Sequence, residues 1–151
     1  MYSRQAKSFQ KILGPLFGLN TLFSPDGSHF LASATQEGGI GLGLAVYSSN
    51  GTYTFSSPTA ATVIQKCAWA NDRTVYCAVP RQISGVWPDA YLKGINTSDR
   101  MVRIDIGHKE ITEVFNQGNL DISEISISKD QGYLFFVNRV DGTLWRYRIK
   151  D

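Results

Sequence analysis

The sequence is poor in the residues that most enzyme and metal sites require. It holds two histidines and two cysteines among 151 residues, too few cysteines for a four-cysteine zinc site. No apolar run approaches the ~18 residues of a transmembrane helix, and residues 1–14 lack the apolar core of a signal peptide. The net charge of +2 and the absence of a basic run offer no attraction for nucleic acid. We therefore expect no nucleic-acid partner and no membrane insertion.

What the chain does contain is apolar alternation with a period of two residues, interrupted by turn signals. Hydrophobic residues make up 42% and aromatic residues 12%, which is enough for a packed core. Turns such as Ser24–Ser28 (SPDGS) and Asn50–Gly51 separate the alternating segments. Because no helical period lies between them, we predict an all-β fold. The predicted strands are 19–23, 29–35, 40–48, 52–56, 62–70, 74–79, 101–106, 110–115, 122–128, 133–138 and 143–149.

These strands fall into repeated antiparallel groups. Turn aspartates recur at Asp26, Asp72 and Asp130, and the second interval is longer because it contains an enlarged loop at 81–100. A repeat of about 40–45 residues with four strands is typical of β-propeller blades. The sequence predicts blade one at 19–56, blade two at 62–115, and blade three at 122–149.

A motif within the repeats resembles a known family. Phe23–Leu31 (FSPDGSHFL) is similar to the F-S-P-D-G-x-x-L core of TolB-type, WD-repeat-like propeller blades, with degenerate copies at 127–136 and 68–76. The copy at 68–76 lacks both Pro and Gly, and the absence of a Trp-Asp dipeptide favours the TolB-like branch. TolB-like proteins are commonly exported, so the resemblance implies a periplasmic or extracellular location, whereas composition leaves the compartment open. The motif says little about function, because such blades serve binders and enzymes alike.

The order of the strands predicts half of a propeller. With strands lettered A to D from the central channel outwards, blade three has only strands A to C, and the alternating segment 7–13 stands where another blade's strand D would be. Propellers typically carry 4–8 blades, so three cannot close a ring. We predict a homodimer that forms a six-bladed ring, in which the N-terminal latch strand 7–13 is exchanged to complete the partner's third blade. The alternative is that the chain is half of a longer propeller.

The two cysteines lie on one predicted hairpin. Cys67 and Cys77 are equally distant from the turn residue Asp72, so they should face each other on adjacent strands at roughly 4.5–5.5 Å between Cα atoms. That distance suits a disulfide. Two interpretations remain: a cross-strand disulfide in an exported protein, or paired buried thiols in a cytosolic one. The enclosed loop is short, so chain entropy alone would give a disulfide little stabilising effect.

The long loop at 81–100 is the leading candidate for ligand contact. In a propeller the B–C and D–A connections share one face, and a loop of this length is usually functional or mobile. We expect it to act together with the neighbouring connections of that face. The candidate ligand-binding residues are Trp87, Asp89, Tyr91, Lys93, Asn96, Asp99, Asn119, Asp121, Arg139 and Asp141. The alternative is that Trp87 and Tyr91 cover the core.

Catalytic chemistry has little support in the sequence. His29 and His108 are expected on turns of the opposite face, and no cluster has the ligand spacing of a metal site. The glycines at 38–43 lead into a strand, so a dinucleotide site is not expected. We predict no catalytic residue, no metal and no cofactor. The expected function is a non-catalytic binding or scaffolding module that self-associates and presents its loop face to a protein, peptide or glycan. The alternative is a lactonase- or esterase-like propeller hydrolase with a site at the channel mouth.

Overall fold

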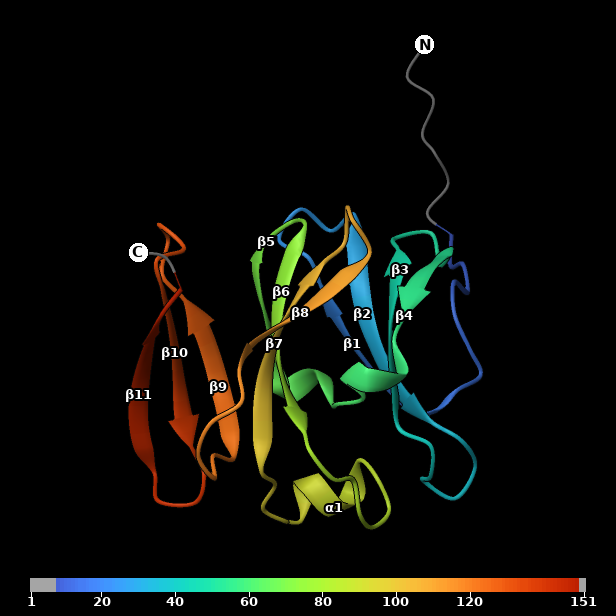
Figure 1. Ribbon diagram of the computed structural model, residues 1–151. Coiled ribbons are helices and arrows are strands. Elements are labelled where there is room, and N and C mark those ends of the chain that lie inside the picture. The colour runs from blue at the N-terminus through green and yellow to red at the C-terminus, as the bar shows by residue number, and fades with distance from the viewer. Residues whose placement is uncertain (1–7, 150–151) are drawn as a thin grey trace.

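The computed structural model describes residues 8–149, which form three antiparallel sheets side by side along an arc (Figure 1). Blade one contains β1 (Phe17–Phe23), β2 (His29–Thr35), β3 (Gly43–Ser48) and β4 (Tyr53–Ser56). Blade two contains β5 (Cys67–Asn71), β6 (Thr74–Pro80), β7 (Asp99–Asp105) and β8 (Glu110–Phe115). Blade three contains β9 (Ile122–Ile127), β10 (Tyr133–Asn138) and β11 (Thr143–Arg148). Consecutive strands are neighbours in every sheet, so the all-β, blade-type fold is confirmed.

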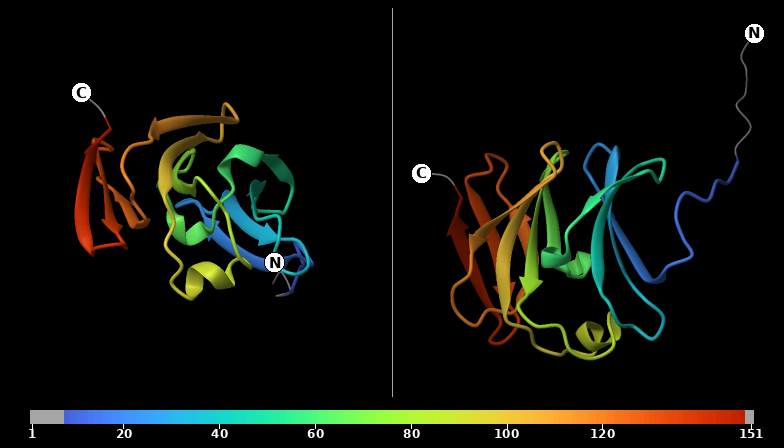
Figure 2. Two further views of the ribbon diagram at one scale, coloured as in Figure 1. Left: turned by 60° about the horizontal axis from the view of Figure 1, so that its bottom comes forward. Right: turned by 45° about the vertical axis from the view of Figure 1, so that its right-hand side comes forward.

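Two apolar layers hold the blades together. Leu31 and Val46 of blade one pack against Val75, Val102 and Ile104 of blade two, all of them fully or almost fully buried. A second layer joins the opposite face of blade two to blade three through residues such as Met101, Leu134 and Phe136. Strand alternation explains this arrangement, because successive side chains of β6 and β7 point to opposite faces of the sheet. Blade two is therefore buried on both faces, and Figure 2 shows it between the other two.

Most predicted strands agree with the observed ones to within two residues at each end, but the strand predicted at 40–48 begins only at Gly43. Strand A of blade two also begins later than predicted. The segment before it contains two 3₁₀ helices, η1 (Pro58–Ala60) and η2 (Ile64–Lys66), and β5 starts only at Cys67. The physical reason is that polar side chains of this segment are buried and form hydrogen bonds in the interior. The Thr62 hydroxyl donates a hydrogen bond of 2.7 Å to the carbonyl of Ala78, and the Lys66 side chain is completely buried.

The hairpin of β5 and β6 has the predicted register. Cys67 lies opposite Cys77, and the two are joined by a disulfide with 4.1 Å between their Cα atoms. Both cysteines belong to the apolar layer between blades one and two. The hairpin is therefore cross-linked at the end remote from its Asp72 turn.

The predicted latch strand at 7–13 needs separate treatment. Lys7 lies outside the described residues, and residues 8–13 have no strand conformation in the single chain. This segment lies on the far side of blade one from blade three (Figures 1 and 2). Because the prediction concerned pairing with a second chain, it stays a prediction.

Candidate ligand-binding face

The blades have two dissimilar ends, which we call the loop face and the turn face. The loop face carries the connection between β6 and β7, the lowest part of Figure 1, and the β8–β9 connection. The turn face carries the hairpin turns β1–β2, β5–β6, β7–β8 and β9–β10. The long connection is partly ordered by its own helix α1 (Asp89–Leu92).

Two predicted ligand residues of this connection are core residues instead. Trp87 is 2% exposed and stacks on Tyr91 with ring centroids 6.1 Å apart, and the indole N–H donates to the carbonyl of Ser84. The pair packs with Leu42 and Val63 in a small apolar cluster. The alternative interpretation, in which both rings cover the core, is therefore correct for their position. Their burial follows from ring size, because aromatic side chains bury the largest apolar areas.

A close backbone approach fixes this connection to blade one. The Trp87 amide donates a hydrogen bond of 3.0 Å to the carbonyl of Gly39, which has a φ of +75°. A Cβ atom at Gly39 would lie 2.4 Å from the Val86 side chain and 2.9 Å from the Trp87 carbonyl oxygen. Only glycine satisfies both the left-handed backbone and the contact. The glycine-rich stretch therefore serves packing of the long connection.

Beneath the loop face lies a completely buried ion cluster, which we call the buried lysine cluster. The Lys66 ammonium donates to Asp99 Oδ2 and to Asp121 Oδ1, each at 2.7 Å, and to the carbonyl of Ile122 at 2.8 Å. All three charged side chains are 0% exposed. The three N–H donors of the ammonium thus have three partners in a site that excludes water. Two more of the predicted ligand residues, Asp99 and Asp121, therefore bind Lys66 in the interior and are not accessible from solvent.

Further residues surround the carboxylate of Asp121. The amide and the hydroxyl of Thr97 donate to it at 3.2 and 3.1 Å, and Arg139 Nη1 lies 3.6 Å from its Oδ2. The Arg139 guanidinium also stacks over the ring of Tyr91, with 4.4 Å between its carbon and the ring centroid. Burial raises the pKa of the Tyr91 hydroxyl, and the nearby Arg139 charge partly opposes that rise. Strands of two blades and the long connection are tied together here.

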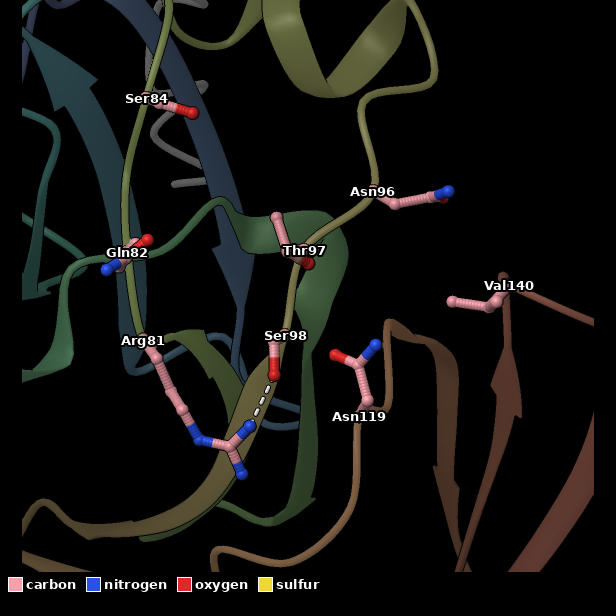
Figure 3. A pocket seen from close by; sticks show the side chains of 8 residues that line it. All are labelled: Arg81, Gln82, Ser84, Asn96, Thr97, Ser98, Asn119 and Val140. Carbon is pink, nitrogen blue, oxygen red and sulfur yellow. Dashed lines mark hydrogen bonds between the residues drawn. The ribbon is translucent and has the colours of Figure 1, made fainter.

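A hollow of about 630 Å³, which we call the loop-face pocket, opens beside the cluster (Figure 3). It lies among the long connection, the β8–β9 connection and the β10–β11 turn. Its lining is hydrogen-bonding and almost free of charge: Arg81, Gln82, Ser84, Asn96, Thr97, Ser98, Asn119 and Val140. The two predicted residues Asn96 and Asn119 reach it from different connections, as Figure 3 shows. Thr97 belongs to both the pocket and the ring of donors around Asp121, so the buried cluster fixes part of the lining.

Arg81 is the one charged side chain of the pocket, and it is held in place. Its Nε donates to Asn116 Oδ1 at 2.7 Å, and its Nη1 donates to the Gly118 carbonyl at 3.1 Å and to the Ser98 hydroxyl. A guanidinium fixed by three neutral partners keeps its positive charge uncompensated. The sequence analysis missed Arg81 as a site residue, and the signal available was its place at the start of the long loop.

The remaining predicted residues lie apart from this pocket. Asp89 and Lys93 are exposed on and after α1, and neither lines the pocket. Asp141 is exposed on the β10–β11 turn, where its carboxylate accepts from the hydroxyl and amide of Thr143 at 2.6 and 3.0 Å. These hydrogen bonds lower the pKa of Asp141. The carboxylate therefore closes its own turn, and Arg139 is the predicted residue of this hairpin that contacts the buried cluster.

Both histidines of the chain belong to the turn face. His29 Nδ1 lies 2.9 Å from Ser28 Oγ, and His108 Nδ1 lies 3.2 Å from Asp105 Oδ2, and both pairs belong to the turn face. Within residues 8–149, no group of three His, Cys, Asp or Glu residues could hold a metal ion. No helix in the described part of the chain has the length and apolar character needed to cross a membrane. The lining of the loop-face pocket contains neither a histidine nor a pair of acids.

Comparisons with known proteins agree with the architecture. No protein-family model and no curated protein sequence matches the chain. A putative TolB from Agrobacterium tumefaciens has a similar structure, with a TM-score of 0.58 and 17% identity over 90% of this chain and 45% of that one. Hydrazine synthase from Kuenenia stuttgartiensis is similar with a TM-score of 0.57 and 12% identity over 84% of this chain and 38% of that one. These similarities concern the fold, and the chain spans less than half the length of either structure.

Proposed function

We propose that this chain, which is built from TolB-like β-propeller blades, is a non-catalytic module that binds a peptide segment of another protein in its loop-face pocket. The observation that carries the proposal is the chemistry of the pocket lining. Amide, hydroxyl and guanidinium groups of two connections, together with Val140 of a third, face one hollow of about 630 Å³. Ligand sites are commonly built this way, from a hollow with a few convergent polar groups.

A peptide fits this lining better than a sugar or a charged metabolite. The amides of Asn96 and Asn119 each offer both a donor and an acceptor, which matches the paired N–H and C=O groups of a peptide backbone. No side chain of the lining is aromatic, so the pocket offers no stacking surface to a sugar ring. Arg81 adds one fixed cation, which suits an acidic side chain or a terminal carboxylate on the ligand.

The hydrolase alternative is less well supported. The two carboxylates beneath the loop face, Asp99 and Asp121, share the Lys66 ammonium and are shielded from solvent. Neither histidine lines the pocket, so an acid–base pair of the usual kind is lacking at this face. Thermal unfolding with and without added calcium or zinc tests the alternative. A midpoint that rises with either ion would support a metal-dependent enzyme.

The experiment that tests peptide binding is selection from a random peptide library, followed by titration of the enriched peptides. We expect Arg81→Ala to weaken the binding by about tenfold or more, since a hydrogen bond to a charged group contributes about 1.5–3 kcal/mol. Asn119→Ala should weaken it by about two- to tenfold, since a hydrogen bond between neutral groups contributes about 0.5–1.5 kcal/mol. Lys129→Ala on the turn face is the matched control and should bind as the wild type does. Enriched peptides that bind both pocket variants with unchanged affinity would contradict the proposal, and enrichment of glycans over peptides would redirect it.

Self-association is the second part of the proposal, and the two ends of the arc support it. The outer face of blade one is uncharged, since Asp26 and Glu37 are the only acids between residues 12 and 65 and both lie on turns. Three alanines and Gly43 of β2 and β3 help to line a shallow hollow of about 200 Å³, next to Tyr47. The outer face of blade three is richer in large side chains, and Leu144 is 72% exposed.

An uncharged face with exposed apolar rings at one end and exposed apolar side chains at the other favour packing of blade three of one chain on blade one of a second chain. Two such contacts related by a two-fold axis would give a closed ring of six blades. Light scattering on the purified chain measures this directly, and we expect the mass of a dimer. A monomer at all concentrations would contradict this part of the proposal and leave the peptide pocket untouched.

The compartment we propose is the periplasm or the extracellular space. Disulfides persist in oxidising environments and are rare in reducing ones, and Cys67 and Cys77 form one. The structural similarity to a TolB protein points in the same direction. Fractionation of cells that express the natural gene would test the location.

A further inference from the structure

The third blade has an outer edge without a partner strand. In blades one and two the outermost strands β4 and β8 cover the edges of β3 and β7. Within the described residues, β11 has β10 on one side and no strand on the other. An unpaired edge presents a row of backbone N–H and C=O groups that can accept another strand.

An apolar pocket of about 300 Å³, which we call the edge pocket, lies beside that strand. It is bounded by the end of β8, by the β8–β9 connection and by the side chains of β11 that face blade two. Its apolar lining consists of Phe115, Leu120, Phe136, Trp145 and Tyr147. Trp145 stacks on Phe136 with ring centroids 6.3 Å apart, yet it remains 46% exposed. A large aromatic side chain that is half exposed beside a free strand edge indicates a docking groove.

Blade two shows what a fourth strand contributes at this place. Ile111 of β8 points back toward blade one and packs on the apolar layer between the two blades. By the same geometry, a strand added to β11 would direct an apolar side chain back toward blade two. The edge pocket lies on that side of β11, because Trp145 and Tyr147 line it.

The segment Ser8–Leu13 has the sequence pattern of β8. Aligned residue by residue with Glu110–Phe115, it is apolar at the same second, fifth and sixth positions and polar at the other three. Phe9 thereby corresponds to Ile111. Each segment is followed by a glycine with positive φ, Gly14 at +99° and Gly118 at +72°, before the next inner strand begins. Ser8–Leu13 therefore carries the pattern of an outermost strand.

We propose that residues 8–13 of a second copy of this chain add to the free edge of β11 and insert Phe9 into the edge pocket. In the single chain the Phe9 side chain is fully exposed, at 108% of its reference area. The segment cannot serve its own β11, because the two lie at opposite ends of the arc (Figures 1 and 2). The main-chain ladder would supply affinity and the pocket would set the register, as in other strand-addition complexes.

This inference rests on the proposed self-association and adds its anchor residue. The exchange would be reciprocal, since each chain offers one segment and one groove. Blade three of each copy would then have four strands, like blades one and two.

The main experiment compares Phe9→Asp with Leu92→Asp by sedimentation equilibrium. Phe9 is fully exposed in the single chain, so its replacement does not unfold the monomer. A buried carboxylate in the apolar edge pocket is strongly unfavourable, and we expect Phe9→Asp to raise the dimer dissociation constant by about 100-fold or more. Leu92 is 66% exposed on α1, outside both pockets, and Leu92→Asp should leave the constant unchanged.

A second measurement reports on the groove itself. A synthetic peptide with the sequence of residues 8–13, added to the Phe9→Asp chain, should shift the fluorescence of Trp145 to shorter wavelength, because it buries a half-exposed indole. The Trp145→Phe variant of the same chain corrects for Trp69 and Trp87 and should show no shift. The same peptide with Asp in place of Phe9 should give no shift with either chain.

The possible failures are distinguishable. A dimer that is unaffected by Phe9→Asp, with Trp145 unresponsive to the peptide, overturns this inference and leaves ring closure through the sheet faces standing. A wild-type chain that is monomeric at all concentrations overturns both the proposed self-association and the insertion of Phe9 into the edge pocket.

Discussion

The turn face and the loop face of the same blades are stabilised by different kinds of contact. On the turn face, contacts are mostly local: Asp26 accepts from Ser24 and Ser28, two residues away on either side. On the loop face, Lys66 joins Asp99 and Asp121, which are 33 and 55 residues away. The turn face adds single hydrogen bonds between blades, from the Asp26 amide to Asp72 Oδ1 at 2.9 Å and from Asn71 Nδ2 to Gln131 Oε1 at 3.1 Å. The loop face instead ties blades two and three together through a completely buried ion cluster. Mutations should separate these two modes clearly.

The largest effect should come from Lys66→Met, which removes the centre of the loop-face contacts. Two buried carboxylates lose their counterion, and breaking a buried ion pair by removing one partner costs about 3–5 kcal/mol. Chemical denaturation measures the change in the free energy of unfolding. Lys93→Met is the matched control on the same face, because Lys93 is exposed, and it should change stability by less than about 0.5 kcal/mol. Equal effects of the two variants would show that the cluster does not stabilise the fold.

The next effect concerns the disulfide, a local cross-link that lies inside the core. Replacing both cysteines in Cys67→Ala/Cys77→Ala should lower the free energy of unfolding by about 2 kcal/mol, near the lower end of the usual range because the loop is short. Reduction of the wild-type protein should lower its stability in the same way. A wild-type chain whose unfolding midpoint does not respond to reductant would argue against a disulfide in solution.

A smaller effect is expected where the buried cluster meets the loop-face pocket. Thr97→Val keeps the shape of the side chain and removes the hydroxyl donor to Asp121, which should cost about 1–2 kcal/mol. The same variant should weaken peptide binding, since Thr97 also lines the pocket. Ser84→Ala, which alters the pocket without touching the cluster, should weaken binding and leave stability unchanged. If neither variant weakened peptide binding, Thr97 and Ser84 would not take part in it, and the buried cluster would have no role in the pocket.

The smallest effect should appear on the turn face and depend on pH. The backbone amide of Ser28, with the hydroxyls of Ser24 and Ser28, lowers the pKa of Asp26 to about 2. A carboxyl whose pKa is lower in the folded state stabilises the fold above its unfolded value, and loses that effect as pH falls through its folded value. Asp26→Asn should therefore lower the thermal midpoint slightly at pH 6, and the difference from wild type should vanish as the pH falls from about 4 to 2. A difference that persists unchanged at pH 2 would contradict this origin.

Much of the fold could be predicted from the sequence because its determinants are local. The alternation in HFLASAT fixes which side chains of β2 face blade two, and the Asp-centred turns fix where the strands reverse. The equal spacing of Cys67 and Cys77 about Asp72 gave the correct hairpin register. The motif at Phe23–Leu31 identified the type of blade, and the structural similarity to a TolB protein agrees with it.

The candidate site was predicted much less well, because its residues are brought together by contacts between blades. Composition of the long loop left Trp87 and Tyr91 open as ligand contacts or as a cover of the core, and their large apolar surfaces are buried against Leu42 and Val63. Lys66 was not considered, because polar Gln65 directly before it gives the lysine no local mark of burial. Asn96 and Asn119 were predicted and do line one pocket, while Asp89, Lys93 and Asp141 do not.

The sequence by itself determined the strands, their turns, the order of the blades and the opposition of the two cysteines, because each depends on residues within one hairpin. Only the tertiary structure decided which carboxylates meet Lys66, which side chains line the loop-face pocket and where the unpaired edge of β11 lies next to an apolar hollow. Those features depend on how whole blades pack against one another. Packing between blades brings together residues that are tens of positions apart. Local sequence patterns do not predict which of these residues will be in contact.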